Sequence, residues 1–308
     1  MLARLRLLLL TFWLGCLAAP AVQAVTVVIV SSERSPAYAQ AAEALVRELE
    51  RTGWSRHDML QLTVAELAGA GVLTPKLFVA LGAQAANALA PLKAPVLCAL
   101  LLRSSFERVL RSSGRKASSQ FSALYLDQPL SRQLGLIQLA LPEARRIGVL
   151  WGPESKTQAP TLRALAQARG LSLREADVGQ GEFLFPGLKA ALEGADVLLA
   201  LADPQVFNSS SIQNILLTSF RAGVPLVAFS PAYVRAGALL ALHVTPEQIG
   251  QQAALIAGGV LQGKALSATP LYSQDFSVDV NEHVARSLGL RLDAVALRTL
   301  LRQREAAP

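Results

Sequence analysis

Residues 197–211 read VLLALADPQVFNSSS, and this stretch decides the fold class. A short continuous apolar run that ends in turn residues is typical of a strand buried on both faces of a parallel sheet. Pro204 cannot continue such a strand, and the asparagine and serines that follow are preferred helix caps. The stretch therefore predicts a buried strand with Asp203 at its carboxyl end and a helix beginning near Ile212.

The same pattern of apolar strand, turn and amphipathic helix recurs along the chain. The predicted strands of the first half span residues 25–30, 60–64, 77–82, 96–102 and 121–126. Those of the second half span residues 146–152, 171–178, 196–203, 224–231 and 238–244. Helical spacing of apolar residues lies between them, as in 37–49, 83–90, 160–170 and 212–223. Strands that alternate with helices form parallel sheets, so the sequence predicts an α/β fold with two doubly wound parallel-sheet lobes.

The domain boundaries follow from the last third of the chain. Five strands already complete the second lobe, so the helix predicted at 246–263 can return to pack on the first. We therefore predict an N-terminal lobe of residues 25–122 plus about 245–270. The C-terminal lobe would comprise residues 123–244 plus about 271–308. Several crossings between two lobes are typical of a hinged clamshell.

The first 24 residues, MLARLRLLLLTFWLGCLAAPAVQA, are typical of a secretory signal peptide. Two arginines precede an apolar stretch that is shorter than the roughly 20 residues of a membrane span. Small residues favour cleavage after Ala24. A lipoprotein site at Cys16 is disfavoured, because Trp13 stands where such sites prefer a small aliphatic residue. We expect a periplasmic or secreted protein.

Several classes of function lack their motifs in this sequence. Cys98 is the one cysteine after the signal peptide and lies in an apolar run, where a small buried hydrophobe is expected. The three histidines, His57, His243 and His283, have no metal-ligand spacing. The sequence contains no phosphate-binding GxxxxGK[ST] motif and no GxGxxG motif after a strand. The net charge of +7 is scattered, and its densest stretch, 103–116, contains a single aromatic residue. We expect no metal, no cofactor and no nucleic acid.

Candidate site residues follow from the predicted topology. In open parallel sheets, ligands bind beyond the carboxyl ends of the strands. The residues at these positions are Ser31, Ser32, Arg34, Gly82, Ala83, Gln84, Arg103, Ser104, Trp151, Gly152, Asp203, Ser230 and Tyr233. Arg103 is the candidate for a bidentate contact to a ligand carboxylate.

Each candidate has a structural alternative. Asp203 is either a wall of the ligand site or the end of a strand before a helix cap. A catalytic role is disfavoured, because no second titrating group or activating base lies beside it in sequence. Gly82 also fits a tight turn, and Arg103 also fits an exposed surface. Trp151 either stacks on a ligand or belongs to the core.

An ordered series of short motifs runs through residues 197–290. Its members are Asp203-Pro204, Gly223-Val224-Pro225, Ala236-Gly237-Ala238, Gly250 with Gln252-Ala253-Ala254, Leu261 with Gly263, and Asn281 with Ala285 and Leu288-Gly289-Leu290. This series resembles the ABC-transporter substrate-binding proteins of the type I periplasmic-binding fold, and more narrowly the subfamily with tryptophan- and other amino-acid-binding members. The segment ALPEARRIGVLWGPES, 140–155, also fits. The resemblance is weaker before residue 120.

The resemblance implies a solute-binding protein. It would be a monomer that captures a small polar or anionic ligand by closure of its lobes and delivers it to an ABC permease in the inner membrane. Relatives often carry Asp-Pro after the fourth strand, where this chain has LLLRSSFERV; an arginine and serines there admit a ligand with an anionic group. The alternatives are a sensor that signals to a membrane receptor and a two-lobed enzyme, such as a racemase or glycosyl transferase.

Overall fold

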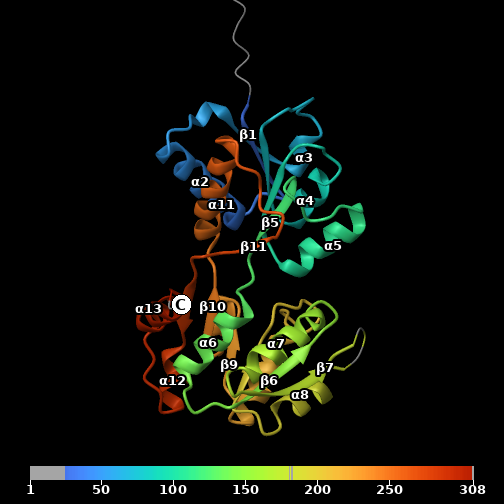
Figure 1. Cartoon of the computed structure of the whole chain (residues 1–308). Coiled ribbons are helices and arrows are strands. Elements are labelled where there is room, and N and C mark those ends of the chain that lie inside the picture. The colour runs from blue at the N-terminus through green and yellow to red at the C-terminus, as the bar shows by residue number, and fades with distance from the viewer. Residues whose placement is uncertain (1–24, 180, 182, 307–308) are drawn as a thin grey trace, which may run out of the picture.

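The structure, a computed structural model, describes residues 25–306 apart from 180 and 182. It contains two α/β lobes, one above the other in Figure 1, and each is built on its own six-stranded sheet. This arrangement confirms the predicted fold class. The predicted signal peptide and Cys16 lie outside the described residues. Within the described part of the chain, no helix is long and apolar enough to cross a membrane.

The first lobe contains a fully parallel sheet with strand order β11-β5-β4-β3-β1-β2. Its strands are β1 (Val27–Ser31), β2 (Met59–Thr63), β3 (Leu77–Leu81), β4 (Val96–Leu101), β5 (Phe121–Tyr125) and β11 (Leu271–Tyr272). Its helices are α2 (Pro36–Arg51), α3 (Val64–Leu67), α4 (Ala83–Leu89), α5 (Arg103–Ser113) and α11 (Pro246–Leu261). Helices α2 and α11 cover one face of this sheet, and α4 and α5 cover the other.

The second lobe has the strand order β12-β10-β9-β8-β6-β7, in which only β12 runs antiparallel to its neighbour among the pairs of the described sheet. Its strands are β6 (Arg146–Trp151), β7 (Ser172–Asp177), β8 (Val197–Leu199), β9 (Leu226–Ala228), β10 (Leu240–His243) and β12 (Ser277–Val280). Its helices are α6 (Leu130–Ala140), α7 (Ala159–Gln167), α8 (Leu184–Leu192), α9 (Ile212–Arg221), α10 (Pro231–Ala236), α12 (Glu282–Ser287) and α13 (Ala294–Ala306).

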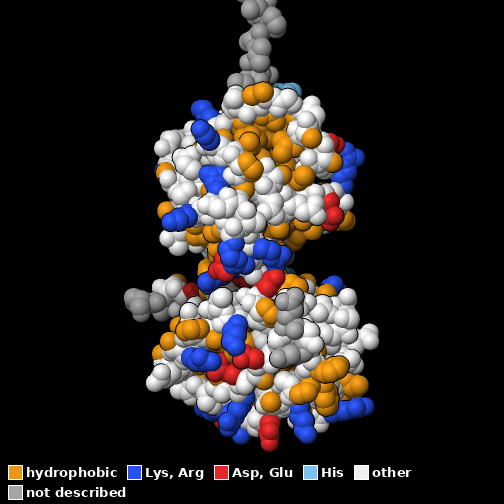
Figure 2. Space-filling view, turned by 90° about the vertical axis from the view of Figure 1, so that its right-hand side faces the viewer, with side chains coloured by type: hydrophobic (Ala, Val, Ile, Leu, Met, Phe, Trp, Pro, Cys, Tyr) orange, Lys and Arg blue, Asp and Glu red, His pale blue; other side chains and the backbone are white. Residues whose placement is uncertain are grey.

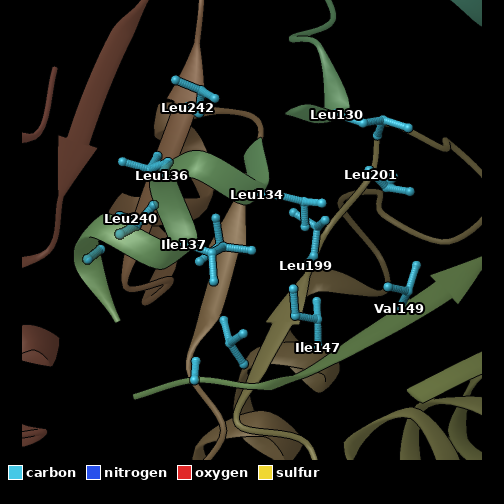
Figure 3. Close-up of a cluster of buried hydrophobic side chains, with 14 of the residues drawn as sticks. Leu130, Leu134, Leu136, Ile137, Ile147, Val149, Leu199, Leu201, Leu240 and Leu242 are labelled. Carbon is cyan, nitrogen blue, oxygen red and sulfur yellow. The ribbon is translucent and has the colours of Figure 1, made fainter. Parts of the chain in front are cut away.

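Both faces of the second sheet are buried. Figure 3 shows Leu134 and Ile137 of α6 beside Ile147 of β6 and Leu199 of β8, within the cluster that also includes α7 and α13. Leu150 of β6 points to the other face, where α8, α9 and α10 pack. Burial on both faces explains why these strands read as continuous apolar runs rather than alternating ones.

The chain crosses between the lobes after β5, after β10 and between β11 and β12. The first crossing comes later than the predicted boundary at 122–123, because all of Phe121–Tyr125 is buried and pairs with β4. The extended segment predicted at 271–280 is divided: Leu271 and Tyr272 pair with β5, and the rest forms β12. Helix α13, which the sequence analysis did not predict, packs on α6.

The third crossing is held from both lobes. From the first lobe, Gln252 of α11 accepts hydrogen bonds from Ser273 Oγ at 3.0 Å and from the Gln274 backbone at 2.8 Å. From the second lobe, Arg132 of α6 donates to the Ser273 carbonyl at 2.9 Å, and its guanidinium lies 4.4 Å from the centre of the Phe276 ring. The crossing is therefore an ordered hinge with partners on either side.

Helices α2 and α11 pack closely where α11 carries Gly250. A Cβ at position 250 would overlap the Ala41 carbonyl oxygen and lie 2.9 Å from Ala44 Cβ. Helix α11 follows β10 of the second lobe in sequence, so this contact is what returns the chain to the first lobe. Gly258, in the same helix, has only Leu49 Cδ2 near its Cβ position, at 3.9 Å.

We expect Gly250→Ala to lower the free energy of unfolding by about 1–3 kcal/mol, because the added methyl group forces the two helices apart. The matched control is Gly258→Ala, where the methyl group meets no close neighbour and the higher helix propensity of alanine should add about 0.5–1 kcal/mol. Urea denaturation of both variants measures the difference. Equal effects at the two positions would contradict the close packing at Gly250.

Candidate functional site

The carboxyl ends of the strands in each sheet face the other lobe, so the loops that follow them meet at the hinge (Figure 1). A cavity of about 440 Å³ lies there, which we call the hinge cavity. Both lobes and two of the crossings line it, with Leu102, Leu126, Asp127, Gln128, Ala202, Phe229, Ser230, Pro231, Leu242, His243, Val244, Thr245 and Pro246. In the space-filling view the same level of the molecule is a narrow waist with charged side chains of both signs (Figure 2).

Two adjacent polar residues of the first crossing line the hinge cavity. Asp127 Oδ2 accepts a hydrogen bond of 2.6 Å from the backbone N–H of Arg103, the first residue of α5. Gln128 is 5% exposed, and its Oε1 accepts a 2.7 Å hydrogen bond from Arg132 Nη1. Its Nε2 is buried and has no hydrogen-bond partner among residues 25–306 as described. An unpaired buried donor costs free energy, so this amide stands out among the polar groups that line the hinge cavity.

The carboxyl group of Asp127 is perturbed. Burial disfavours its charged form and raises its pKa to about 6, against the opposing effects of the Arg103 N–H and the Arg103 charge. Arg103 does not neutralise it fully, because its Nε donates to Glu107 at 2.8 Å. For Arg103 itself, burial is outweighed by hydrogen bonds to Glu107 and Tyr272, which hold the pKa above the ordinary value for arginine.

The other polar groups of the hinge cavity have protein partners. Ser230 Oγ accepts from the Ala232 N–H at 3.3 Å and caps α10. Thr245 forms a capping box with Gln248 at the start of α11. His243 Nε2 lies 3.1 Å from Asp279 Oδ2. Burial lowers the pKa of His243, and the neighbouring Asp279 charge opposes that shift.

An aromatic group forms the second-lobe side of the hinge cavity. The Phe229 ring packs edge-on against Phe207 and Tyr233, with ring centres 6.2 and 5.0 Å apart. Tyr233 donates its hydroxyl to the Phe207 carbonyl at 3.1 Å. Of the two residues predicted here, Ser230 lines the hinge cavity, whereas Tyr233 supports Phe229 from behind.

Asp203 is an internal anchor rather than an exposed wall. It is 1% exposed. Its Oδ2 accepts from the N–H groups of Glu154 and Ser155 at 2.9 and 2.8 Å and from Ser155 Oγ at 2.9 Å. Its Oδ1 accepts from the Gln205 N–H at 3.0 Å. The carboxylate therefore holds the loop after β6 against the end of β8. This is a structural role, not a wall of the ligand site.

Gly152 and Trp151 belong to the same internal arrangement. Any Cβ at position 152 would overlap the Asp203 carboxylate, so this loop needs glycine for close approach. Trp151 is 2% exposed in the core of the second lobe, and its Nε1 donates to Glu175 at 2.7 Å. This burial fits the reading of Trp151 as a core residue and does not fit stacking on a ligand.

The candidate site residues that follow β1 lie away from the hinge cavity, either at a separate hollow or in the interior of the first lobe. Ser31 and Arg34 line a separate hollow of about 530 Å³ with α2 and the end of β2, where Arg34 pairs with Glu66. Ser32 is buried: its Oγ donates to the Leu81 carbonyl at 2.9 Å and accepts from the Ala85 N–H at 3.1 Å. These residues do not reach the hinge cavity.

The loop after β3 is built around Gly82, which has a φ of +89°. A Cβ there would lie 2.5 Å from Ser32 Oγ and from the Tyr38 hydroxyl, so both the conformation and the space require glycine. Ala83 and Gln84 begin α4; Ala83 is partly buried and Gln84 is exposed. Their predicted contact with a ligand stays a prediction.

A β-bulge sets the direction of the chain as it leaves β4. Cys98 pairs with Ala123 and Leu101 with Tyr125, so β4 has one more residue than β5 over this interval. Leu100 has a φ of +54°, a left-handed conformation that is rare for leucine. The bulge places Arg103 and Ser104 at the start of α5, where the Arg103 N–H meets Asp127. Ser104 Oγ is buried with no hydrogen-bond partner among the described residues.

An ion pair joins the two lobes beside the hinge cavity. Arg108 of α5 in the first lobe pairs with Glu154, in the loop after β6 of the second lobe. The Glu154 backbone is itself held by Asp203. The pair is partly exposed, so its direct contribution to stability is small, but it shows that α5 and the β6 loop face each other across the groove.

Sequence reasoning missed most of the hinge cavity. Asp127, Gln128 and Thr245 lie on crossings, which were predicted only as connections, and His243 ends β10, within a segment that was predicted only as a strand. Phe229 was treated as part of a strand. The available signal was the polar pair Asp127-Gln128, which directly follows a buried strand end in the same manner as Asp203. Cys98 is buried as predicted, and burial raises the pKa of its thiol.

The fold and the cavity together define a class: a two-lobed α/β binding protein with its candidate site at the hinge. The family model for ABC transporter substrate binding proteins matches residues 73–299, so the chain belongs to that family. The match begins after β2 of the first lobe and includes all three crossings and the whole sheet of the second lobe.

Known proteins agree with this assignment. A tyrosine-binding protein of Clostridioides difficile (strain R20291) is 23% identical over 186 residues, which are 59% of this chain and 52% of that protein. The match thus spans about half the length of that relative. The ligand-free, open structure of a substrate-binding protein with adhesive properties from Clostridium difficile has a TM-score of 0.68 at 20% identity, covering 87% of this chain and 96% of that one.

A second solved structure has the same fold. The ABC domain in complex with L-Trp from Streptococcus pneumonia gives a TM-score of 0.58 at 18% identity, covering 88% of this chain and 98% of that one. At these identities the solved structures establish the shared fold. The family and these neighbours are binding proteins rather than enzymes.

We expect Asp203→Ala to lower the free energy of unfolding by about 3 kcal/mol, because it leaves several buried N–H and O–H donors without an acceptor. Hydrogen exchange of the Glu154 and Ser155 amides should accelerate more than that of the rest of the second lobe. The matched control is Asp177→Ala, which removes an exposed pair with Lys156 and should cost less than about 1 kcal/mol. Unchanged exchange at residues 154 and 155 would contradict the anchoring role.

We expect Asp127→Asn to raise the free energy of unfolding of the ligand-free protein at pH 7 by about 1–2 kcal/mol. The pKa of Asp127 is about 6 in the folded protein, above its ordinary 3.8, so folding favours the protonated carboxyl. This stabilisation is fully present below about pH 4 and is lost as the pH rises through about 6. Asparagine stays neutral and keeps the acceptor for the Arg103 N–H.

The gain from Asp127→Asn should therefore be large at neutral pH and close to zero near pH 4. Urea denaturation of wild type and variant at both pH values tests this. A gain that does not depend on pH, or a loss at pH 7, would show that the Asp127 carboxylate is not disfavoured by the folded protein.

Proposed function

We propose that this protein is the exported solute-binding component of an ABC-type uptake system, which captures a small polar or anionic ligand, such as an amino acid or a related compound, between its lobes. The observation that supports this most directly is the hinge cavity, which has walls from both lobes and from the segments that connect them. A ligand bound there contacts both lobes at once. The tyrosine- and tryptophan-binding relatives support the choice of ligand class.

The hinge cavity supplies the contacts that closure requires. A ligand shifts the balance between open and closed forms only by binding one form more tightly, and a change from 1:99 to 99:1 requires about 5.5 kcal/mol of differential affinity. Asp127 and Gln128 come from the first crossing, and Ser230 and Phe229 come from the second lobe. Several hydrogen bonds from two lobes can supply this difference, whereas one loop cannot.

The proposal extends to the partner and the location. Delivery to an ABC permease in the inner membrane and export to the periplasm, with the signal peptide removed after about Ala24, fit the family to which the chain belongs. We propose that the protein acts as a monomer. Loading of the closed form would present both lobes to the permease together.

A thermal-shift panel of L-amino acids, aromatic acids and small anions tests the binding function. A true ligand should raise the melting temperature with concentration, by the equivalent of about 2.7 kcal/mol at one hundred times its Kd. Small-angle scattering should show a smaller radius of gyration when the same ligand is present, because the lobes close.

Two variants test whether the ligand binds in the hinge cavity. Ala202→Trp fills the hinge cavity from its wall and should abolish the shift, whereas Val72→Trp, at a position that is 94% exposed in the first lobe, should leave it intact. A shift that survives in Ala202→Trp would place the ligand outside the hinge cavity. No concentration-dependent shift with any compound would argue against a solute-binding role.

A further inference from the structure

We propose that the second lobe carries a binding site for a small phosphate-type dianion, either inorganic phosphate or a phosphate monoester, formed by Arg132, Arg169 and Arg304. The site lies between helices of the second lobe and is separate from the hinge cavity. Its occupant would act on the hinge through Arg132, which holds two of the crossings. The inference does not depend on the proposed solute-binding function.

The site is a hollow of about 530 Å³ at α6 and α13, two helices that pack against each other next to the hinge (Figure 1). We call it the arginine hollow, and its polar walls are Ser131, Arg132, Gln138, Arg169, Arg304 and Glu305. The hinge cavity shares none of these described residues. Three arginines against one glutamate leave the walls of the arginine hollow with a net charge of +2.

Arg132 is the buried member of the arginine hollow, with 7% of its side chain exposed. Its Nε donates to Glu305 at 2.7 Å. Its Nη1 donates to Gln128 Oε1 at 2.7 Å and to the Ser273 carbonyl at 2.9 Å. Its Nη2 has no hydrogen-bond partner among residues 25–306 as described. A guanidinium has five N–H donors in a planar fork, so the Nη2 edge is left for an oxyanion.

Arg169 and Arg304 bring positive charge to the arginine hollow without a carboxylate partner in the described chain. Arg169 Nη1 donates to the Leu165 carbonyl at 3.2 Å. Arg304 forms no hydrogen bond or ion pair with a described residue. Other arginines of this lobe, such as Arg146 and Arg163, pair with carboxylates. The two arginines of the hollow are therefore available to an anion from solution.

Helix ends alone do not explain this arrangement. Arg169 follows the end of α7, and Arg304 lies in the last turn of α13. A positive charge is favoured at a helix C-terminus in any case. That effect does not require both arginines to line the same hollow as a buried third one. A shared anion accounts for their convergence.

Two neutral donors complete the walls of the arginine hollow. Ser131 contributes a hydroxyl and Gln138 an amide, and neither side chain has a hydrogen-bond partner among the described residues. Phosphate oxygens accept hydrogen bonds from both kinds of group, and the guanidinium fork matches them bidentately. The donors present are therefore those that a phosphate group uses.

The charge and the size of the arginine hollow select the class of anion. A phosphate monoester carries roughly −1.5 to −2 charges at pH 7, which balances the net charge of +2 on the walls. A monoanion such as acetate would leave one positive charge uncompensated. The volume of about 530 Å³ also leaves room for the small organic group of a monoester. Glu305 already neutralises part of Arg132 and therefore competes with the anion.

Arg132 connects the arginine hollow to the hinge. The same guanidinium holds Gln128 in the wall of the hinge cavity and the Ser273 carbonyl in the third crossing. It also lies 4.4 Å from the centre of the Phe276 ring. An anion bound to Nη2 would fix this guanidinium in place, and with it both crossings. By thermodynamic linkage, the anion and the occupant of the hinge cavity would then change each other's affinity by the same factor.

Calorimetric titration of the wild-type protein with inorganic phosphate, glycerol 3-phosphate and acetate, at neutral pH and constant ionic strength, tests the proposal. Both phosphates should bind saturably, and acetate should not. Arg169→Gln and Arg304→Gln should each lower the phosphate affinity by at least about tenfold, since each removes a charged hydrogen-bond donor. Glu305→Gln should raise the affinity by about two- to fivefold, because it removes the competing carboxylate and keeps an acceptor for Arg132.

Arg221→Gln is the matched control. Arg221 is exposed at the end of α9, a helix that packs on the other face of the sheet. The variant removes the same charge and should keep the phosphate affinity within about twofold of wild type, because distant surface charges are screened. Ala202→Trp, which fills the hinge cavity, should bind phosphate as wild type does. Saturating phosphate should slow hydrogen exchange at residues 273–276 and leave α9 unchanged.

Every other outcome counts against the proposal. Absence of saturable binding for both phosphates would overturn the site, as would equal losses in Arg221→Gln and Arg304→Gln. A loss in Ala202→Trp would place the anion in the hinge cavity instead. Unchanged exchange at residues 273–276 under saturation would disprove the connection through Arg132. Failure of the thermal-shift panel with every solute other than phosphates would remove the proposed solute-binding function and leave the arginine hollow standing.

Discussion

The structure depends on a constraint of chain connectivity: helix α11, which follows the last parallel strand of the second lobe, packs against α2 in the first. Gly250 makes this possible by letting the two backbones approach closely. Because α11 returns to the first lobe, the chain must cross again to supply β12 and the helices after it. Three connections thus leave at the same edge of the two sheets, and the ends of the remaining strands face one another across a groove.

Two aspartates at strand ends have opposite environments in this groove. Asp203 is surrounded by donors from one loop and is used entirely within the second lobe. Asp127 receives a backbone N–H but shares the nearest positive charge with Glu107, and its pKa rises to about 6. A carboxylate saturated by its own protein holds a loop in place. The Asp127 carboxylate is buried with too little compensation, so the folded protein disfavours its charged form.

The sequence predicted where the loops at the strand ends begin, but it could not rank these loops as candidate sites. Ser230 was found because it follows a parallel strand, and it lines the hinge cavity. Trp151 ends β6 and Asp203 follows β8, yet both are buried within the second lobe, where they contact Glu175 and Ser155. Gln128 was overlooked because its importance comes from burial and from a missing partner, and both depend on Arg132 and the third crossing. Leu100 gave no sequence signal for its left-handed conformation.

The alternation of buried strands and helices, and through it the two parallel sheets, is predictable from local sequence, because apolar periodicity is a local property that survives in any tertiary context. The ordered motifs of the second half also carried the family. The meeting of particular strand ends, the positions of the crossings and the polar groups left uncompensated depend instead on how the chain folds. Those properties are set by contacts between residues far apart in the chain, such as Arg132 with Ser273 or Asp203 with Ser155. Local sequence cannot encode the burial and electrostatics that such contacts create.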